Sequence, residues 1–238
     1  MDLSIIIPAF NEENRILVTV EKTVRFLRER PWRYELIVVD DGSSDHTAEK
    51  VQKAYVSCAS VRCIRNPENR GKGYSVRQGV RVAQGGIVGY MDADYKTEIS
   101  CLDRVVELLE TGCDGVIGDR SAEASTIAVP RRGYRQIGSR VFRVLLHRLI
   151  GLDHLGDTQC GFKFFKRNIV QALFSRQRVD GYMFDVEILL LAKRCGYSIE
   201  AIPVLWQDDP DSRFNPVSGM ARNLGELVRI YWGYRRAR

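Results

Sequence analysis

The sequence predicts an α/β fold built on a doubly wound, mostly parallel β-sheet, and three observations point to it. Short apolar runs alternate with longer stretches whose apolar residues recur at helical spacing. The short runs are apolar at nearly every position, as in strands that helices cover on both faces. Polar residues follow several of these runs directly, at the strand ends where ligands bind in such sheets.

The expected elements can be placed in order along the chain. The first strand is rich in β-branched residues, and the stretch after it has Ile16, Val20 and Val24 at helical spacing. The expected strands are residues 3–8, 35–40, 61–65, 87–91, 114–118, 162–165 and 199–205. The expected helices are residues 13–28, 44–56, 71–83, 99–110, 132–150 and 184–195, and a last helix from Ser218.

Composition limits the class of protein. With 238 residues, 45% of them hydrophobic, the chain has enough apolar material for one core, so we expect a single domain over residues 1–238. The net charge of +6, concentrated in residues 120–150 and 213–238, indicates an anionic partner. The six cysteines lack the spacing of a zinc site or a disulfide framework. Without a leader or a run of ~20 apolar residues, we expect a cytoplasmic protein, or a peripheral one on the cytoplasmic face of a membrane.

Asp92 and Asp94 form an Asp-Ala-Asp motif directly after the strand at residues 87–91. Carboxylate oxygens are hard ligands that hold Mg²⁺ or Mn²⁺, and a metal held there can bridge a diphosphate. It would stabilise the negative charge that accumulates on a departing nucleotide diphosphate. The same tripeptide also occurs as a solvated acidic turn, so the motif alone does not define a function.

Asp40 and Asp41 follow another apolar strand and begin the turn Asp-Asp-Gly-Ser. A carboxylate at this edge can accept the imide proton of uracil, or the amine and imide protons of guanine, and Gly42 permits a tight turn. We interpret Ser44 and Asp45 as caps of the helix that follows.

Two further connections complete this edge of the sheet. The connection at residues 8–12 has two possible roles: it flanks the same nucleoside, or it only ends the strand and caps the next helix. Its candidate binding residues are Pro8, Ala9, Asn11 and Glu12. In the segment 69–73, Gly71 lets backbone amides approach a phosphate and Lys72 supplies positive charge. The segment is not a GxxxxGK[ST] loop, which argues against ATP or GTP hydrolysis.

Taken together and in this order, these motifs resemble those of family 2 glycosyltransferases with the GT-A fold. That family has a Pro-Ala-x-Asn-Glu start, an Asp-Asp-Gly-Ser-x-Asp turn that Asp45 completes here, an Asn-x-Gly-Lys-Gly segment and an Asp-x-Asp motif. The resemblance implies a hexosyltransferase in which Asp92 and Asp94 bind Mg²⁺ or Mn²⁺ and Ala93 lies at the donor. It divides the chain into a nucleotide-sugar-binding half, residues 1–119, and an acceptor half, residues 120–214.

Residues 157–163, Asp-Thr-Gln-Cys-Gly-Phe-Lys, resemble a segment of dolichyl-phosphate glucosyltransferases, and residues 184–187 and 202–206 continue the resemblance. It implies UDP-glucose as donor, dolichyl or polyprenyl phosphate as acceptor, and inversion at the anomeric carbon. Related mannosyl enzymes use GDP-mannose, and these motifs do not decide the base or the sugar.

The same resemblance implies which residues hold the two substrates. Arg120, Arg135 and Ser139 fall where polyprenyl-phosphate transferases hold the acceptor phosphate. Arg135 and Ser139 are four residues apart and so share one helix face, which is also what an ordinary solvated face would look like. Arg213 matches a basic position in a loop that closes over the diphosphate, although the usual Gly-Ser-Lys reads Asp-Ser-Arg at residues 211–213.

The expected mechanism depends on the acceptor. A phosphate monoester is already ionised near pH 7, since its second pKa is ~6, so it attacks the anomeric carbon in line without a general base. A sugar hydroxyl would need a base, for which Asp157 is the first candidate, followed by Asp185 and Glu187. All three carboxylates are equally suited to orienting arginines or capping helices.

Two alternative functions stay open. Transfer to a soluble glycan or small-molecule hydroxyl fits a chain with no membrane span. A nucleic-acid-binding module would use the arginine-rich segments but would leave the acidic edge unexplained, because acidic clusters repel phosphates unless a metal intervenes. We therefore expect no nucleic-acid partner.

Residues 215–238 are expected to form a C-terminal amphipathic helix. Its apolar residues recur at helical spacing beside several arginines; they are Leu224, Leu227, Val228, Tyr231 and Trp232. Such a helix can lie in a membrane interface and contact anionic lipids, or it can pack on the sheet as the last helix of the domain. The two possibilities are compatible.

Overall fold

The computed structural model describes residues 1–120, 156–206 and 216–235. Strands and helices alternate through most of this part of the chain. The strands are Leu3–Ala9 (β1), Tyr34–Asp40 (β2), Val61–Arg65 (β3), Ile87–Met91 (β4), Gly115–Asp119 (β5), Phe162–Lys166 (β6) and Ile199–Pro203 (β7). The helices are Ile16–Arg28 (α1), Thr47–Ala54 (α2), Lys72–Val82 (α3), Ile99–Cys101 (η1), Leu102–Glu110 (α4), Arg167–Arg176 (α6), Phe184–Arg194 (α7) and Pro216–Arg235 (α8).

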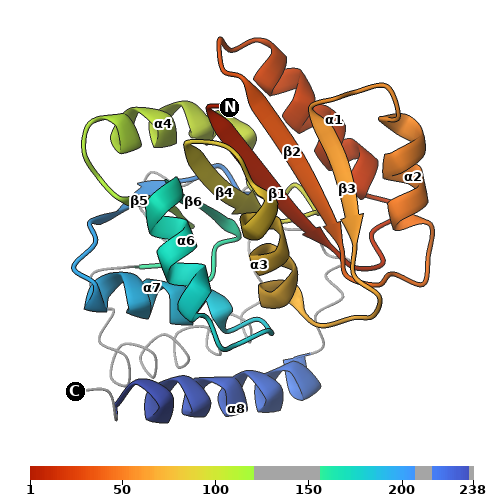
Figure 1. Cartoon of the computed structure of the whole chain (residues 1–238). Coiled ribbons are helices and arrows are strands. Elements are labelled where there is room, and N and C mark those ends of the chain that lie inside the picture. Colours follow the sequence, from red (N-terminus) through yellow and green to blue (C-terminus); the bar gives the residue numbers. More distant parts are fainter. Residues whose placement is uncertain (121–155, 207–215, 236–238) are drawn as a thin grey trace.

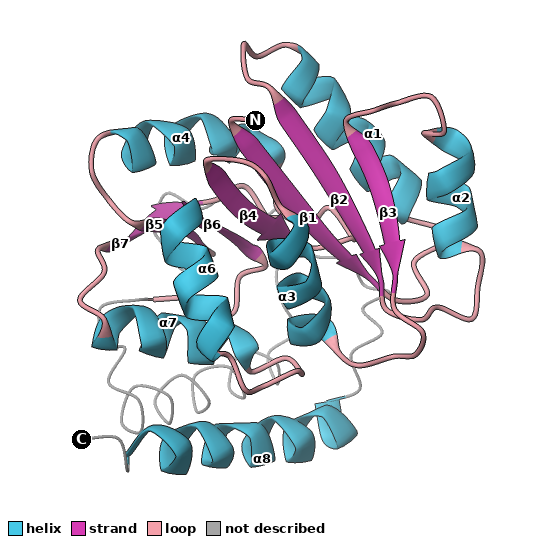
Figure 2. Ribbon diagram, in the orientation of Figure 1, coloured by secondary structure: helices cyan, strands magenta, loops and turns pink. Residues whose placement is uncertain are grey.

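The strands form one sheet in the order β3-β2-β1-β4-β6-β5-β7. β1 pairs in parallel with β2 and β4, β2 with β3, and β5 with β7. Of the strands that the structure describes, only β6 runs antiparallel to its neighbours, β4 and β5. The predicted mostly parallel sheet is therefore confirmed, with one reversed strand near its middle (Figure 2).

Helices cover both faces of the sheet, as a doubly wound fold requires (Figure 1). Because side chains alternate along a strand, β1 sends Ile6 to one face and Ile5 and Ile7 to the other. On the Ile6 side, α3, α6 and α7 close one apolar cluster. On the opposite side, α1, α2 and α4 close a second cluster. Burial on both faces explains why the strands are apolar at nearly every position.

Some boundaries differ from the sequence prediction for identifiable reasons. The helix α1 begins three residues later than expected, because Asn11 has a left-handed φ of 55° and the carbonyl of Glu12 accepts the N–H of Arg15 in a turn. The helix α2 begins at Thr47, and its N-cap residue is His46, which makes no side-chain capping bond, so the prediction that Ser44 or Asp45 is the cap is wrong in position. Asp45 lies one residue before the N-cap and still accepts the N–H of Thr47 on Oδ1 at 2.9 Å.

Two other segments depart from the prediction. β7 ends at Pro203, two residues earlier than expected. Helix α6 was not predicted, although Ile169, Val170 and Leu173 are buried at helical spacing along its inner face. It follows β6 without a break, so its apolar residues resemble a continuation of that strand. The helix expected at residues 132–150 lies outside the described residues.

The last helix, α8, packs on the domain and also keeps an apolar stripe in solvent. Leu227 and Ile230 are buried in the cluster that contains α6 and α7. Leu224, Val228 and Trp232, spaced four apart, are 50%, 49% and 54% exposed. Both expected roles of this helix therefore remain physically available. No helix within the described ranges has the length and apolar character needed to cross a membrane.

Candidate active site

The connections that follow β1 and β2 are tied together by hydrogen bonds. The backbone N–H of Asn11 donates to the Ser43 hydroxyl at 2.9 Å, and the side-chain oxygen of Asn11 accepts the N–H of Ser44 at 2.9 Å. The N–H of Glu12 donates to the Thr47 hydroxyl at 2.8 Å. These contacts fix the two connections relative to each other at the carboxyl edge of the parallel strands.

Asp40 lies at the end of β2, fully buried, beside the end of β1. Ala9 is its partner in the parallel register, and both Ala9 and the preceding Pro8 are buried. Arg65 contacts Oδ2 of Asp40 at 3.1 Å, and the N–H of Ser43 donates to the same oxygen at 3.4 Å. Within the described part of the chain, Oδ1 of Asp40 is buried and accepts no hydrogen bond. A buried carboxylate oxygen in this state is suited to a donor from a ligand.

Asp41 is buried and its carboxylate is occupied by the protein itself. Oδ2 accepts the N–H of Gly71 at 2.7 Å, and Oδ1 accepts the N–H of Arg70 at 3.1 Å and the side-chain amide of Asn66 at 2.8 Å. The N–H of Asp41 in turn donates to the carbonyl of Ala9 at 2.8 Å. Asp41 therefore shapes the glycine-rich turn before α3, which was predicted to hold a phosphate.

Gly71 and Lys72 place a lysine ammonium beside the Asp-Ala-Asp motif. Gly71 has a φ of 106°, and a Cβ there would lie 2.5 Å from the carbonyl oxygen of Asp180, so only glycine fits. Lys72 begins α3, and its Nζ lies 2.6 Å from Oδ1 of Asp92. Burial acts to lower the pKa of Lys72, but attraction to Asp92 and then to Asp185 outweighs it and raises the pKa above its usual value.

The two carboxylates of the Asp-Ala-Asp motif face the solvent side of the strand end. The side chain of Asp92 is 41% exposed and that of Asp94 is 18% exposed, while Ala93 between them is buried. Lys96 Nζ lies 2.9 Å from Oδ2 of Asp94. Gly161 packs against the motif so closely that a Cβ there would lie 2.1 Å from Oδ2 of Asp92.

The residues present fit a hard divalent cation. Asp92 and Asp94 each face a lysine ammonium, so positive charge is already favoured in front of both carboxylates. In residues 1–120, 156–206 and 216–235, no group of three or more His, Cys, Asp or Glu side chains could hold a metal ion. Two carboxylates supply only part of the shell of Mg²⁺ or Mn²⁺, which leaves positions for diphosphate oxygens and water.

Asp157 and Arg120 form a bidentate ion pair. Arg120 Nε lies 2.5 Å from Oδ2 of Asp157, and Nη2 lies 2.9 Å from Oδ1. Burial acts to raise the pKa of Asp157, but the charge and hydrogen bonds of Arg120 outweigh it and lower the pKa to about 2. The guanidinium of Arg120 also lies over the Trp206 ring. With this pKa, Asp157 is a poor general base near neutral pH.

Asp185 and Glu187, the other candidate bases, lie in the first turn of α7 and are buried. Asp185 accepts the Tyr90 hydroxyl at 2.6 Å and the Lys163 ammonium at 2.7 Å. Glu187 accepts the hydroxyl of Tyr234 in α8 at 2.7 Å. Both carboxylates therefore hold elements of the fold together.

For three residues of the predicted site the structure gives no position. Arg135, Ser139 and Arg213 lie outside the described residues. Conversely, the structure adds Lys96 and Gly161, which contact Asp94 and Asp92 and were not singled out from the sequence. For Lys96 the only signal was its place two residues after the motif. For Gly161 the signal was its place in the segment 157–163, but its contact with Asp92 joins the turn before β6 to the turn after β4 and could not be read from the sequence.

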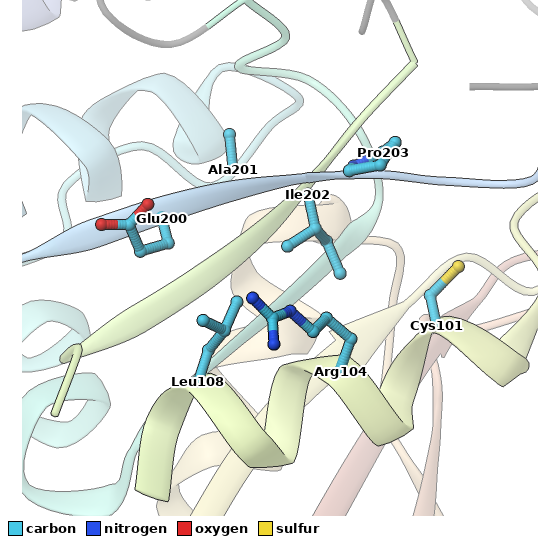
Figure 3. Close-up of a pocket in the computed structure, with 7 residues that line it drawn as sticks. All are labelled: Cys101, Arg104, Leu108, Glu200, Ala201, Ile202 and Pro203. Atoms are coloured by element: carbon cyan, nitrogen blue, oxygen red, sulfur yellow. The ribbon is translucent and has the colours of Figure 1, made fainter. Parts of the chain in front are cut away.

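A groove of about 430 Å³ lies between α4 and the edge strand β7, away from these residues. In Figure 3, Arg104 and Leu108 of α4 face Ile202 of β7. None of the carboxylates or lysines described above lines it. The candidate active site is therefore the carboxyl edge of β1, β2 and β4.

A doubly wound sheet with a carboxylate pair after its central strand and a glycine-lysine turn, and with a buried carboxylate oxygen that has no partner among the described residues, is typical of the GT-A class of nucleotide-sugar transferases. The chain belongs to this class through its sequence as well. The family model for glycosyl transferase family 2 matches residues 4–174, and the chain is a member of that family.

Known proteins similar to this chain in sequence, and known structures similar to it in fold, are both sugar-transferring enzymes. The chain is 32% identical to dolichyl-phosphate beta-glucosyltransferase of Dictyostelium discoideum, over 98% of this chain and 74% of that protein. It is 33% identical to the Saccharomyces cerevisiae protein of the same name, over 98% and 75%. The fold is similar to glucosyl-3-phosphoglycerate synthase from Mycobacterium tuberculosis, solved with Mn²⁺, UDP and phosphoglyceric acid, with a TM-score of 0.70, 21% identity, and 96% and 76% coverage.

Proposed function

We propose that this chain transfers glucose from UDP-glucose to a dolichyl or polyprenyl phosphate, with inversion at the anomeric carbon. The observation that carries the proposal is the similarity to dolichyl-phosphate beta-glucosyltransferases over nearly the whole chain, from residues of β1 to α8. The arrangement of carboxylates and lysines at the carboxyl edge supports it, because a departing nucleotide diphosphate needs positive charge where these side chains lie.

In this proposal the donor half, residues 1–119, binds the nucleotide. The unpaired Oδ1 of Asp40 accepts the imide proton of uracil, between the connection at residues 8–12 and the turn at residues 69–73. Gly71 and Lys72 approach the diphosphate, and Lys72 exchanges its contact with Asp92 for one with a phosphate oxygen. Asp41 acts indirectly, by holding the backbone of that turn.

Asp92 and Asp94 are the residues that would hold Mg²⁺ or Mn²⁺. When bound, the cation supplies charge that stabilises the leaving UDP. Lys96 lies beside Asp94 and limits the net negative charge of the motif. Gly161 leaves room for the Asp92 carboxylate.

The acceptor half, residues 120–214, presents the lipid phosphate. One oxygen of the phosphate dianion attacks the anomeric carbon in line while the bond from that carbon to the UDP oxygen breaks, and UDP leaves with the electron pair. No side chain has to remove a proton, because the acceptor phosphate is ionised near pH 7. The low pKa of Asp157 fits this reaction, since its carboxylate holds Arg120 and is not needed as a base. On the resemblance to polyprenyl-phosphate transferases, Arg120, Arg135 and Ser139 hold the acceptor phosphate and Arg213 closes over the diphosphate.

The donor is tested with a panel of radiolabelled sugar nucleotides. The protein is incubated with polyprenyl phosphate, Mn²⁺ or Mg²⁺, and UDP-glucose or GDP-mannose, and the organic phase is counted. Label from UDP-glucose alone is the expected result. Label from GDP-mannose alone would contradict the proposed donor while leaving lipid-phosphate transfer in place.

The partner of α8 in this proposal is an anionic membrane surface on the cytoplasmic side. Leu224, Val228 and Trp232 form the exposed apolar stripe, and Arg222 and Arg229 are exposed on the same helix. An exposed apolar stripe beside arginines suits the boundary between head groups and acyl chains, where each arginine contributes about 1 kcal/mol on anionic lipid. Contact there would bring the carboxyl edge close to a lipid-borne phosphate.

Vesicle flotation tests this contact with substitutions at Leu224, Val228 and Trp232, each to Ser. Removing the chain from Tyr234 onward would also remove its hydrogen bond to Glu187, so point changes separate membrane contact from folding. The control replaces Val18 and Val56, exposed apolar residues elsewhere, by Ser. Wild type and control are expected to float with anionic vesicles, and the triple variant is not. Equal recovery of all three would exclude α8 as the docking surface.

A further inference from the structure

A lysine with no exposed surface lies in the middle of the sheet. Lys163 of β6 donates from Nζ to Oδ1 of Asp185 at 2.7 Å and to the carbonyl oxygen of Cys160 at 2.6 Å. Tyr90 is its direct partner in the antiparallel register, and the Tyr90 hydroxyl donates to the same oxygen of Asp185 at 2.6 Å. We call Lys163, Asp185 and Tyr90 the buried junction.

The buried junction lies where several elements of the candidate active site meet. It joins β4 and β6 to the first turn of α7, which in turn packs against the first turn of α3. Gly73 of α3 has no room for a Cβ, which would lie 2.6 Å from Cβ of Phe184, the first residue of α7. Lys72 comes directly before Gly73, and its ammonium is attracted by Asp185 as well as by Asp92.

The turn that Lys163 binds is the surface against which Asp92 rests. Cys160 offers its carbonyl to Lys163, and the carbonyl of the next residue, Gly161, accepts the N–H of Asp92 at 3.0 Å. The Asp92 carboxylate lies over Gly161, where a Cβ would come within 2.1 Å of Oδ2. A shift of this turn would therefore move both the backbone and the carboxylate of Asp92.

We propose that Lys163 is a positioning residue: by joining the Cys160 carbonyl to Asp185, it holds the turn at Cys160 and Gly161 in the place that sets Asp92 for a divalent cation. The inference rests on the proposed role of Asp92 as a metal ligand.

Fold stability alone does not require a lysine at this position. A buried ion pair replaced by neutral groups of similar volume often leaves stability unchanged, because the desolvation cost of both charges disappears with their attraction. Groups that orient a metal ligand behave differently, since their removal typically lowers metal affinity or activity about 10–100-fold. The two roles therefore predict different effects on unfolding and on metal binding.

The test compares Asp185→Asn with the double variant Lys163→Met/Asp185→Asn. Both have the same neutral amide, which can still accept the Tyr90 hydroxyl, and they differ only in the ammonium that holds the Cys160 carbonyl. Mn²⁺ binding is measured by calorimetry with UDP present in saturating amount, and thermal unfolding is recorded for each protein. Asp185→Asn leaves the buried Lys163 ammonium without a counter-charge, so it is expected to unfold at a lower temperature than wild type but to bind Mn²⁺ within about threefold of it. The double variant is expected to bind Mn²⁺ at least about tenfold more weakly, although its unfolding temperature is no lower than that of Asp185→Asn.

Arg62→Met is the matched control, because it removes the cation that lies 2.8 Å from the buried carboxylate of Glu35 at a distance from the motif. It is expected to lower the unfolding temperature without changing Mn²⁺ affinity. Equal Mn²⁺ affinity in Asp185→Asn and the double variant would overturn the role of Lys163 and leave the proposed function intact. If wild type bound no Mn²⁺ in the presence of UDP, the metal role of Asp92 and the inference built on it would both fall.

Discussion

Replacing Asp41 by Asn tests whether its carboxylate organises the turn before α3. The carboxylate accepts three hydrogen bonds, from Gly71, Arg70 and Asn66, at 2.7, 3.1 and 2.8 Å. An amide oxygen can keep the two bonds of Oδ1, but its NH₂ group would face the Gly71 N–H. One buried donor without an acceptor costs about 1–3 kcal/mol, and weaker bonds to a neutral oxygen add to this, so we expect a loss of about 2–4 kcal/mol. That lowers the unfolding temperature by about 5–15 °C.

Differential scanning calorimetry measures the effect, with Asp103→Asn as control. Asp103 pairs with Arg30 at 2.8 Å but its side chain is 51% exposed, and exposed pairs contribute about 0–1 kcal/mol. Its unfolding temperature should stay within about 3 °C of wild type. If Asp41→Asn were as stable as Asp103→Asn, the hydrogen bonds of Asp41 would not hold the turn, and a direct role in substrate binding would be the better account.

Three further predictions concern the motif and the ion pair behind it. Asp92→Asn and Asp94→Asn should each lower the rate of sugar transfer at least about a hundredfold, because amides are poor ligands for hard cations. The free energy of unfolding of each variant should stay within about 1 kcal/mol of wild type. Full turnover of either variant, or of wild type in excess EDTA, would remove the metal from the mechanism. Gly161→Ala should lower Mn²⁺ affinity about tenfold, since the new methyl group displaces the Asp92 carboxylate, and unchanged affinity by calorimetry would count against this packing. Because the pKa of Asp157 is lowered to about 2, below the ordinary value of about 3.9, its ionised form stabilises the fold by about 2 kcal/mol above pH 4, a contribution lost as the pH falls to about 2. The stability difference between wild type and Arg120→Met in urea should therefore shrink from pH 5 to pH 2, and a constant difference would contradict the assigned pKa.

Local sequence pattern was sufficient for most of the fold. β3 and β4 were predicted with the boundaries that the structure has, because each is a short segment with β-branched residues and no competing helical spacing. The reversal of β6 and the existence of α6 were not predicted. The direction of a strand is not encoded in its own apolar pattern, and α6 follows β6 with no turn residues between them.

For the candidate site, the sequence indicated which residues gather at the edge but not what each one does. Asp40 and Asp41 are adjacent and chemically identical, yet Asp41 holds three protein donors while Asp40 keeps one oxygen without any in the described part of the chain. That difference comes from opposite side-chain directions at the end of β2. Likewise Asp157 suited a base by type alone, and only its contact with Arg120 gives it a pKa too low for that role.

The most direct test of the proposed function identifies the acceptor and the configuration of the product in one reaction. Wild-type protein is incubated with UDP-glucose labelled at the anomeric carbon with ¹³C, Mn²⁺, and an equimolar mixture of dolichyl phosphate and 3-phosphoglycerate, and both phases are examined by NMR. We expect the label in the organic phase, joined to phosphate in the β configuration. Label that stays in the aqueous phase on 3-phosphoglycerate, or an α-linked lipid product, would contradict the account.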